Sequence, residues 1–332
     1  MMCMKGRVQR YMIALGAAGA LGVSSIVLPA GAAEKYPEKP ISWIVPYGPG
    51  GGTDIVARLL TNKITQSINQ SIVVENRPGG NTMIGTQALL KARPDGYTVM
   101  QTAEQIAANE SLYKDLKFKV SKDFSYVAPL VRTPLVLVAR KDLPASTPQE
   151  LFVYMKNKGS AVNYGSWGQG GMNHLTMEAF ASRIGAQPTH VPFNGAAAAI
   201  KELVAGNIDL YFSDYGTAMS YVETGRIKPI LVSSKERLPM LPNVPTIHES
   251  GFENFDMYSF QGVVMPEGAP KDAIESLSIQ IQKALQDKEV REALMARGFL
   301  PNPGTPEDFQ AQVLRAQSDF AKIIQERGIR LE

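Results

Sequence analysis

A glycine-rich loop between an expected strand and an expected helix is the first segment of this sequence that could do chemistry. It runs from Tyr47 to Asp54 and contains four glycines. Glycines let backbone N–H groups approach a ligand closely, and a helix N-terminus favours an anion. We therefore expect anion or ligand binding here, although Thr53 or Asp54 could simply cap a tight turn. The candidate ligand-binding residues are Tyr47, Gly48, Gly50, Gly52, Thr53 and Asp54.

The two common nucleotide-binding motifs do not fit this loop. A P-loop ends in Lys-Ser/Thr, which is missing here, and the glycine spacing differs from that of the dinucleotide fingerprint. We expect no cofactor.

A second glycine-rich loop, Tyr164 to Leu175, repeats the arrangement later in the chain. Ser166 and His174 leave open a serine hydrolase, but Tyr164 stands where a nucleophile elbow requires glycine. Because no convincing catalytic set is present, we expect a binding protein and no catalytic residues. The candidate ligand contacts are Ser166, Trp167, Gly168, Gly171, Asn173 and His174, of which Trp167 and His174 could instead only pack.

Three shorter segments that follow expected strands add further candidates. Ala103 and Glu104 follow one strand, Phe193 and Asn194 a second, and Asp214 a third. Glu104 would repel a carboxylate, but it could accept a hydrogen bond from a ligand amine or hydroxyl, or face solvent. Asn194 and Asp214 could act only as helix caps.

The composition excludes several other classes of protein. The chain has 332 residues, 34 Lys+Arg, 31 Asp+Glu, three His and one Cys. So few Cys and His argue against a disulfide scaffold and a metal site. Three cations and no acidic residue precede residue 34, so the remainder carries 34 − 3 = 31 cations against 31 anions. This balance gives no reason to expect nucleic acid or membrane binding.

The first residues are typical of an export signal. Three cations (Lys5, Arg7 and Arg10) precede an apolar run from Tyr11 to Leu28, and small residues follow it. A membrane anchor is the alternative, but glycines interrupt the run. We predict a cleaved Sec-type signal peptide over residues 1–32, a periplasmic location and a mature chain that is not embedded in the membrane.

The elements that must position the loops alternate between strands and helices. Periodicity predicts strands at 41–45, 71–75 and 97–102, with helices between them, which indicates a parallel sheet covered by helices. A second helix–strand set follows, and we expect strands at 127–132, 135–140 and 257–264 to connect the halves. The expected fold class is α/β with two lobes. Lobe I would comprise residues 34–133 plus 258–332, and lobe II residues 134–257.

Several short motifs, in this order, resemble the Bug/TctC-type periplasmic solute-binding proteins of tripartite tricarboxylate transporters. The similarity runs from about Tyr36 to Ile329. Each motif is weak alone, but the series is specific. The matching segments include Val45 to Asp54, Glu75 to Asn81, Pro94 to Thr98, Lys122 to Phe124, Gly168 to Leu175, His190 to Phe193, Leu241 to Thr246 and Glu249 to Gly251.

This resemblance implies a Venus-flytrap architecture, like that of type II periplasmic binding proteins. Two lobes, each a mainly parallel sheet flanked by helices, would be joined by two crossing strands. One small carboxylate would lie in the cleft, held by loop backbone, helix N-termini and ordered waters without turnover. The implied contacts are Tyr47 to Asp54, Ser166 to Asn173, Phe193 to Gly195 and Asp214. The implied partners of a monomeric receptor are the membrane subunits of the transporter, with a sensor protein as the alternative.

The sequence departs from the family pattern at three places. The family commonly has Tyr-Lys-Gly or Tyr-Arg-Gly where Phe193-Asn194-Gly195 stands, so a hydroxyl and a cation are missing. Trp167 replaces a small residue, and Phe260-Gln261-Gly262 replaces Trp-x-Gly. We hypothesise a more apolar cleft that binds an aromatic or dicarboxylic acid.

Overall fold

The computed structural model describes residues 36–330. The signal peptide expected over residues 1–32 lies outside the described residues. Within the described part, no helix combines the length and apolar character needed to cross a bilayer.

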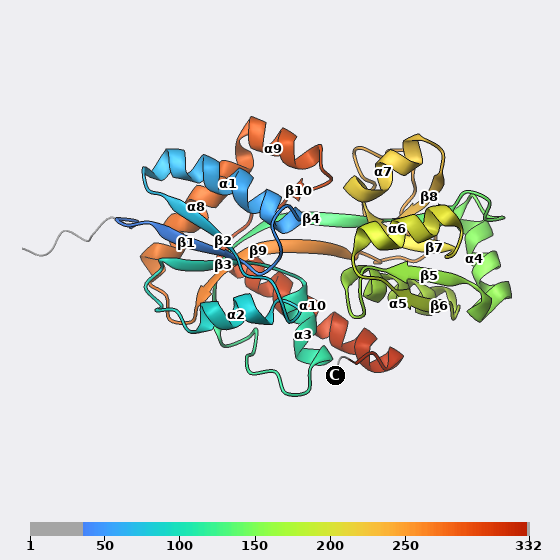
Figure 1. The fold of residues 1–332 in the computed structure, drawn as a ribbon, viewed down its shortest axis with the longest axis horizontal. Helices are drawn as coiled ribbons and strands as arrows, with labels where there is room; N and C mark the ends of the chain where they lie inside the picture. The colour runs from blue at the N-terminus through green and yellow to red at the C-terminus, as the bar shows by residue number, and fades with distance from the viewer. Residues whose placement is uncertain (1–35, 331–332) are drawn as a thin grey trace, which may run out of the picture. The chain divides into compact units, whose positions relative to one another are not determined.

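The described chain has the expected α/β architecture with two lobes (Figure 1). One mixed sheet runs through it in the order β2-β1-β3-β9-β4-β7-β5-β6, and β8 and β10 also pair with β4. Parallel pairs occur in two groups, β2-β1-β3 in one lobe and β7-β5-β6 in the other. All other pairs are antiparallel, so each lobe is more mixed than a mainly parallel sheet.

The first lobe contains the strands β1 (Ile41–Val45), β2 (Ile72–Asn76), β3 (Thr98–Ala103) and β10 (Leu300–Pro301). Its helices are α1 (Gly52–Ile68), α2 (Met83–Leu90), α3 (Gln105–Leu112), α8 (Lys271–Gln286), α9 (Lys288–Met295) and α10 (Pro306–Arg327). One apolar cluster joins α1 and α8 to one face of the sheet and includes Trp43, Leu60 and Ile281, all fully buried or nearly so. Burial of such side chains stabilises the fold by about 1.5–3 kcal/mol each.

The second lobe contains the strands β5 (Asn163–Ser166), β6 (Thr189–Pro192), β7 (Leu210–Asp214) and β8 (Ile227–Val232). Its helices are α4 (Pro148–Lys158), α5 (Met172–Ile184), α6 (Ala196–Ala205) and α7 (Tyr215–Glu223), and a 3₁₀ turn spans Gly159–Ala161. Alternate residues of β7 face opposite sides. Phe212 packs with Phe180 of α5, whereas Tyr211 packs with Leu203 of α6.

Two long strands connect the lobes, β4 (Phe124–Arg140) and β9 (Tyr258–Pro266) (Figure 1). β4 is one continuous strand, although the sequence indicated two. Pro129 sits beside a register shift, and Pro134 ends the stretch that pairs with β9, before β4 continues with β7 and β8. Proline is tolerated at such places because no ladder hydrogen bond from its nitrogen is needed. The sequence break between residues 132 and 135 is therefore a change of partner.

Candidate functional site

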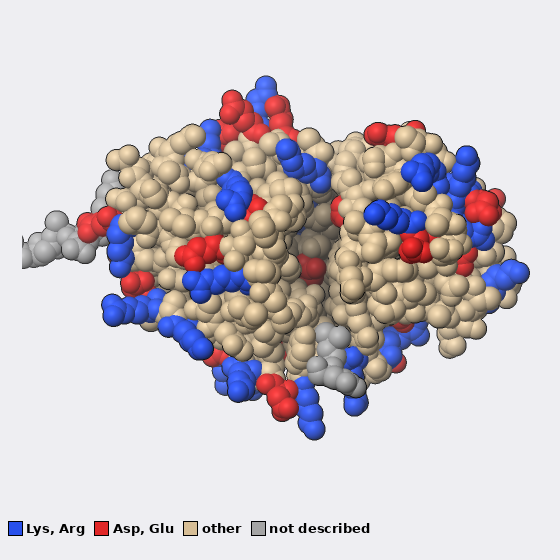
Figure 2. All heavy atoms as spheres, viewed as in Figure 1, with Lys and Arg blue, Asp and Glu red and all other residues tan. Residues whose placement is uncertain are grey.

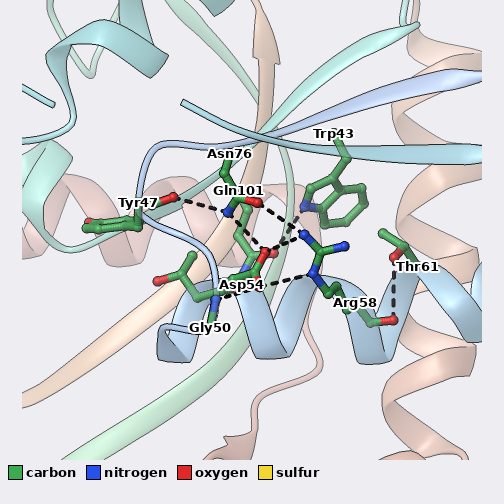
Figure 3. Close-up of polar contacts among 9 residues, drawn as sticks. Trp43, Tyr47, Gly50, Asp54, Arg58, Thr61, Asn76 and Gln101 are labelled. Atoms are coloured by element: carbon green, nitrogen blue, oxygen red, sulfur yellow. Dashed lines mark hydrogen bonds and ion pairs between the residues drawn. The ribbon is translucent and has the colours of Figure 1, made fainter. Parts of the chain in front are cut away.

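The loop before α1 is held in place by the buried carboxylate of Asp54, which is 3% exposed. Its Oδ2 accepts from the backbone N–H of Gly50 at 2.9 Å and from Arg58 Nε at 3.0 Å. Its Oδ1 accepts from Asn76 Nδ2 at 2.9 Å, and the same amide donates to the carbonyl of Tyr47 at 3.1 Å. Figure 3 shows Asp54 at the centre of these contacts. Asp54 therefore positions the loop through its internal partners.

Hydrogen bonds decide the ionisation of Asp54. Burial acts to raise the pKa of this carboxyl group, but the hydrogen bonds from Arg58, Gly50 and Asn76 together outweigh burial and lower the pKa. Asp54 is thus an anion whose charge is matched inside the protein.

The N-terminus of α1 itself keeps its backbone donors available. Gly51 is the N-cap and no side chain caps the helix, while Gly50, Gly51 and Gly52 are exposed. Gly50 has φ +78°, a conformation that side chains other than glycine rarely adopt. Thr53 is buried in the first turn. Exposed N–H groups at a helix start can bind a carboxylate.

Two buried glutamines, Gln101 and Gln261, form a hydrogen-bonded pair that contacts this helix start. Trp43 Nε1 donates to Gln101 Oε1 at 3.1 Å, and Gln101 Nε2 donates to the Thr53 carbonyl at 3.0 Å and to Gln261 Oε1 at 2.7 Å. Sequence reasoning missed Gln101, and it included Gln261 only within a departure from the family pattern, without a role. They meet only because β3 and β9 are neighbours in the sheet, and no local pattern marks them.

In the second lobe, Ser166 is fully buried and contacts a histidine other than the one expected. Its Oγ lies 2.7 Å from His190 Nε2, and the backbone N–H of Gly168 donates to the same oxygen at 3.2 Å. His174 Nδ1 instead accepts from the backbone N–H of Gly170 at 3.0 Å. The Ser166–His174 pair of the hydrolase alternative is therefore wrong. His190 belongs to a segment that matches the family, but it was not a candidate contact of Ser166; β5–β6 pairing places it beside this loop.

The two histidines stack face to face, with ring centroids 3.8 Å apart and an interplanar angle of 9°. Tyr164 continues the stack, 5.0 Å from the His190 ring, and its hydroxyl donates to Glu178. Glu178 also pairs with Arg327 of the last helix. His174 lies in the first turn of α5, whose N-cap Gly171 makes no side-chain cap, and the backbone N–H of His174 donates to Asn173 Oδ1 at 2.9 Å.

Three buried polar atoms near this helix start have no hydrogen-bond partner among the described residues: Asn173 Nδ2, Tyr211 OH and Ser213 Oγ. Burial is the main cause that raises the pKa of Tyr211, while Ser213 and Asn173 lie close enough to oppose it. Buried polar atoms normally find partners. Tyr211 and Ser213 are thus site candidates that the sequence alone did not reveal.

The remaining predicted residues have different surroundings. Asp214 caps α7 by accepting from the backbone N–H of Thr217 at 2.8 Å, as its capping alternative required. Trp167 is half-buried, and its indole lies so close to Gly171 that a Cβ there would be 2.6 Å from Nε1. Phe193 packs partly into the core, whereas Asn194 is exposed.

Glu104 and Ala103 lie at the end of β3, and both are buried. Glu104 Oε2 accepts from Ser259 Oγ at 2.6 Å and from the Phe260 backbone N–H at 3.4 Å. Burial raises the pKa of Glu104, and the charge of Glu104 adds to burial in raising the pKa of the Tyr47 phenol.

The candidate residues follow the carboxyl ends of parallel strands in each lobe. Ligands of open α/β sheets bind outside such ends. Figure 2 shows a hollow between the two lobes, with mostly uncharged walls and acidic atoms in its depth. Among the described residues, no group of three or more His, Cys, Asp or Glu side chains is placed to hold a metal ion.

His174 gives a testable pH dependence. Burial, followed by the neighbouring His190 and Arg327, lowers the pKa of His174 to about 3. An unfolded histidine titrates near 6.5. As pH falls, His174 is therefore protonated in the unfolded chain before it is protonated in the folded protein. The stability that neutral His174 contributes is complete above about pH 6.5 and is lost as pH falls toward 3.

We expect His174→Gln to flatten the fall in Tm between about pH 6.5 and pH 4, measured by thermal unfolding. Met177→Leu, on the same helix and without a titratable group, is the control and keeps the wild-type slope. An unchanged slope in His174→Gln would contradict this account.

Two α/β lobes are joined by crossing strands, and in both lobes a glycine-rich helix start without a side-chain cap follows a strand. These features are those of the two-lobed periplasmic binding proteins. Residues 56–329 match the family described as "Tripartite tricarboxylate transporter family receptor". The chain belongs to this family, which confirms the Bug/TctC resemblance.

Relatives and solved structures agree with this assignment. BugT of Bordetella pertussis is 31% identical over 302 residues, which is 90% of this chain and 93% of BugT. Rpa4515 of R. palustris, solved with adipate, has a TM-score of 0.78 and 29% identity, covering 89% of this chain and 100% of that one. MatC of Rhodopseudomonas palustris, solved with malate, has a TM-score of 0.74 and 28% identity, covering 87% and 100%.

Proposed function

We propose that this protein is a periplasmic solute-binding receptor that captures a small organic carboxylate between its lobes. It would then deliver the ligand to the membrane subunits of a tripartite tricarboxylate-type transporter. The observation that carries the proposal is the uncapped, glycine-flanked N-terminus of both α1 and α5. Family membership adds the transporter class.

Capture would proceed by closure of the lobes on the ligand. A carboxylate that accepts from the N–H groups of both helix starts gains its full set of contacts only when both lobes engage. The ligand therefore shifts an open–closed equilibrium toward the closed state. Excluding water strengthens each hydrogen bond to the anion. The contacts we propose are those of the loops 47–54 and 166–174, with Glu104, Phe193 and Asn194 at the sides.

For the ligand, we propose a dicarboxylic or aromatic acid. The structures with adipate and malate show that similar proteins bind dicarboxylates of different length. The exchange of a family Tyr-Lys/Arg pair for Phe193-Asn194 supports the less polar, aromatic alternative.

A thermal-shift screen of the mature protein tests this proposal. The panel contains mono-, di- and tricarboxylates, aromatic acids and the matching amides, which carry no anion. We expect at least one acid to raise Tm by several degrees in a concentration-dependent way, because a bound ligand stabilises by mass action. Its neutral amide should not. If citrate and succinate stabilise strongly and aromatic acids do nothing, the aromatic alternative is wrong. If no acid has an effect, the proposed function itself fails.

A further inference from the structure

Glu104 is a buried carboxylate without a matching positive charge. Its side chain is 7% exposed, and it forms no ion pair with any described residue. Asp54, at the same edge of the sheet, is equally buried but has Arg58 and two further donors. Isolating a carboxylate from water is costly unless charge or hydrogen bonds compensate it. The contrast between the two acids singles out Glu104.

The contacts of Glu104 do not require its charge. Although it occupies the N-cap position of α3, it makes no capping bond. Its Oε2 takes both donors from β9, while Oε1 accepts from no side chain of the described residues. A glutamine could accept the same two bonds through its carbonyl oxygen. The backbone N–H of Glu104 itself also donates to the carboxylate. Because each carboxylate oxygen can accept more than one hydrogen bond, Oε1 can still accept from a further partner.

Its position places this oxygen near the proposed ligand. Glu104 follows β3, whose neighbour β1 leads into the loop before α1. The charge of Glu104 also acts on the first residue of that loop, because it adds to burial in raising the pKa of the Tyr47 phenol. A ligand carboxylate at the N-terminus of α1 would therefore have an acidic group close to it. Two carboxylates in such a poorly hydrated place repel each other.

We propose that Glu104 selects a ligand that carries a hydrogen-bond donor, an ammonium or hydroxyl group, next to its carboxylate, and selects against the plain acid. This inference rests on the proposed function. The ligand donor would bind Oε1, and the ligand carboxylate would bind the helix start. A hydrogen bond to a charged group contributes about a tenfold to hundredfold difference in affinity.

The experiment uses ligands that differ only in one substituent. Succinate, malate and aspartate carry H, OH and NH₃⁺ at C2, and adipate and 2-aminoadipate form a second pair. Affinities for all five are measured by calorimetry with the wild type and with Glu104→Gln. Glu267→Gln, at the far end of β9, is the matched control. Melting curves without ligand check that each variant is folded.

We expect the wild type and Glu267→Gln to bind the donor-bearing member of at least one series about tenfold or more tightly than its plain acid. In Glu104→Gln that preference should disappear, mainly because the plain acid binds more tightly. Equal wild-type affinities within both series would overturn the inference, as would a preference that survives in Glu104→Gln. Weaker binding of succinate to Glu104→Gln, together with wild-type affinity that falls as pH rises, would show that a protonated Glu104 donates to the ligand. That outcome also overturns it.

The two proposals fail in different ways. If plain acids bind but Glu104 does not discriminate, or if none of the five compounds binds while another acid of the wider screen does, only the inference fails. If neither these five compounds nor any acid of the wider screen binds, the proposed function fails and the inference falls with it.

Discussion

Gly262→Ala is expected to lower the free energy of unfolding by about 2–3 kcal/mol. A Cβ at this position would lie 2.1–2.5 Å from the ring atoms of Phe309, far inside contact distance. Gly262 pairs with Thr102 on one side and Pro129 on the other, so its backbone has little room to move away. Phe309 is fully buried and packs edge-on against Tyr126, so its ring cannot swing into solvent. Urea unfolding measures the loss.

A double-mutant cycle tests the cause of this loss. Phe309→Leu removes the outer ring atoms. Gly262→Ala should therefore lower the free energy of unfolding clearly less in the Phe309→Leu protein than in the wild type. Gly48→Ala is the control, because a Cβ at Gly48 meets nothing within 4 Å. It should change stability by less than about 0.5 kcal/mol. A Gly262→Ala protein as stable as the wild type would show that the sheet and α10 separate easily.

Asp54→Ala should weaken binding of any carboxylate found in the screen by about tenfold or more, and cost about 2–3 kcal/mol of stability. The substitution leaves the N–H of Gly50 without its acceptor and Asn76 Nδ2 with only the Tyr47 carbonyl, and the loop before α1 loses its anchor. The helix start would then have to be ordered at the moment of binding, which reduces affinity. Calorimetry gives the affinity, and urea unfolding gives the stability.

The pH dependence of this loss follows from the lowered pKa of Asp54. The ionised carboxylate contributes stability above the pKa of an unfolded aspartate, near 3.9. This contribution is lost as pH falls through the lower pKa of Asp54 in the folded protein. The stability difference between wild type and Asp54→Ala should therefore be full at neutral pH and shrink below about pH 4. Arg58→Gln, which removes only the half-exposed cation, is the milder comparison. Unchanged ligand affinity in Asp54→Ala would mean that the loop holds its shape without this anchor.

The parts of the fold that local patterns encode were predictable. The strands 41–45 and 97–102 and the helix after Gly52 have clear periodicity, and the observed β1, β3 and α1 agree with them within one or two residues. The helix α3 was missed because almost all of its residues are buried, which removes the amphipathic signal. The helix α9 is short and follows directly on α8, so no separate start was visible, whereas the possible cap at Asp214 did mark the start of α7.

The same division holds for the site. The loop at Gly48–Gly52 was found because glycine spacing is a local property of the chain. The contacts between Ser166 and His190 and between Gln101 and Gln261 join residues 24 and 160 positions apart. Strand pairing brings these partners together. Without the sheet order, every buried polar residue would have been an equal candidate.

The place of β9 in the sheet also sets an order of assembly. It lies between β3 and β4, although it follows them in the chain by more than a hundred residues. Strands β5 to β8 follow one another in the chain, so β7 and β8 can pair with the end of β4, β5 with β7, and β6 with β5, as soon as they are made. Strands β3 and β4 cannot be joined until β9 has been synthesised, and such long-range closure is slow. During synthesis, the sheet of the first lobe would therefore stay incomplete between β3 and β4 while strands β5 to β8 of the second lobe fold.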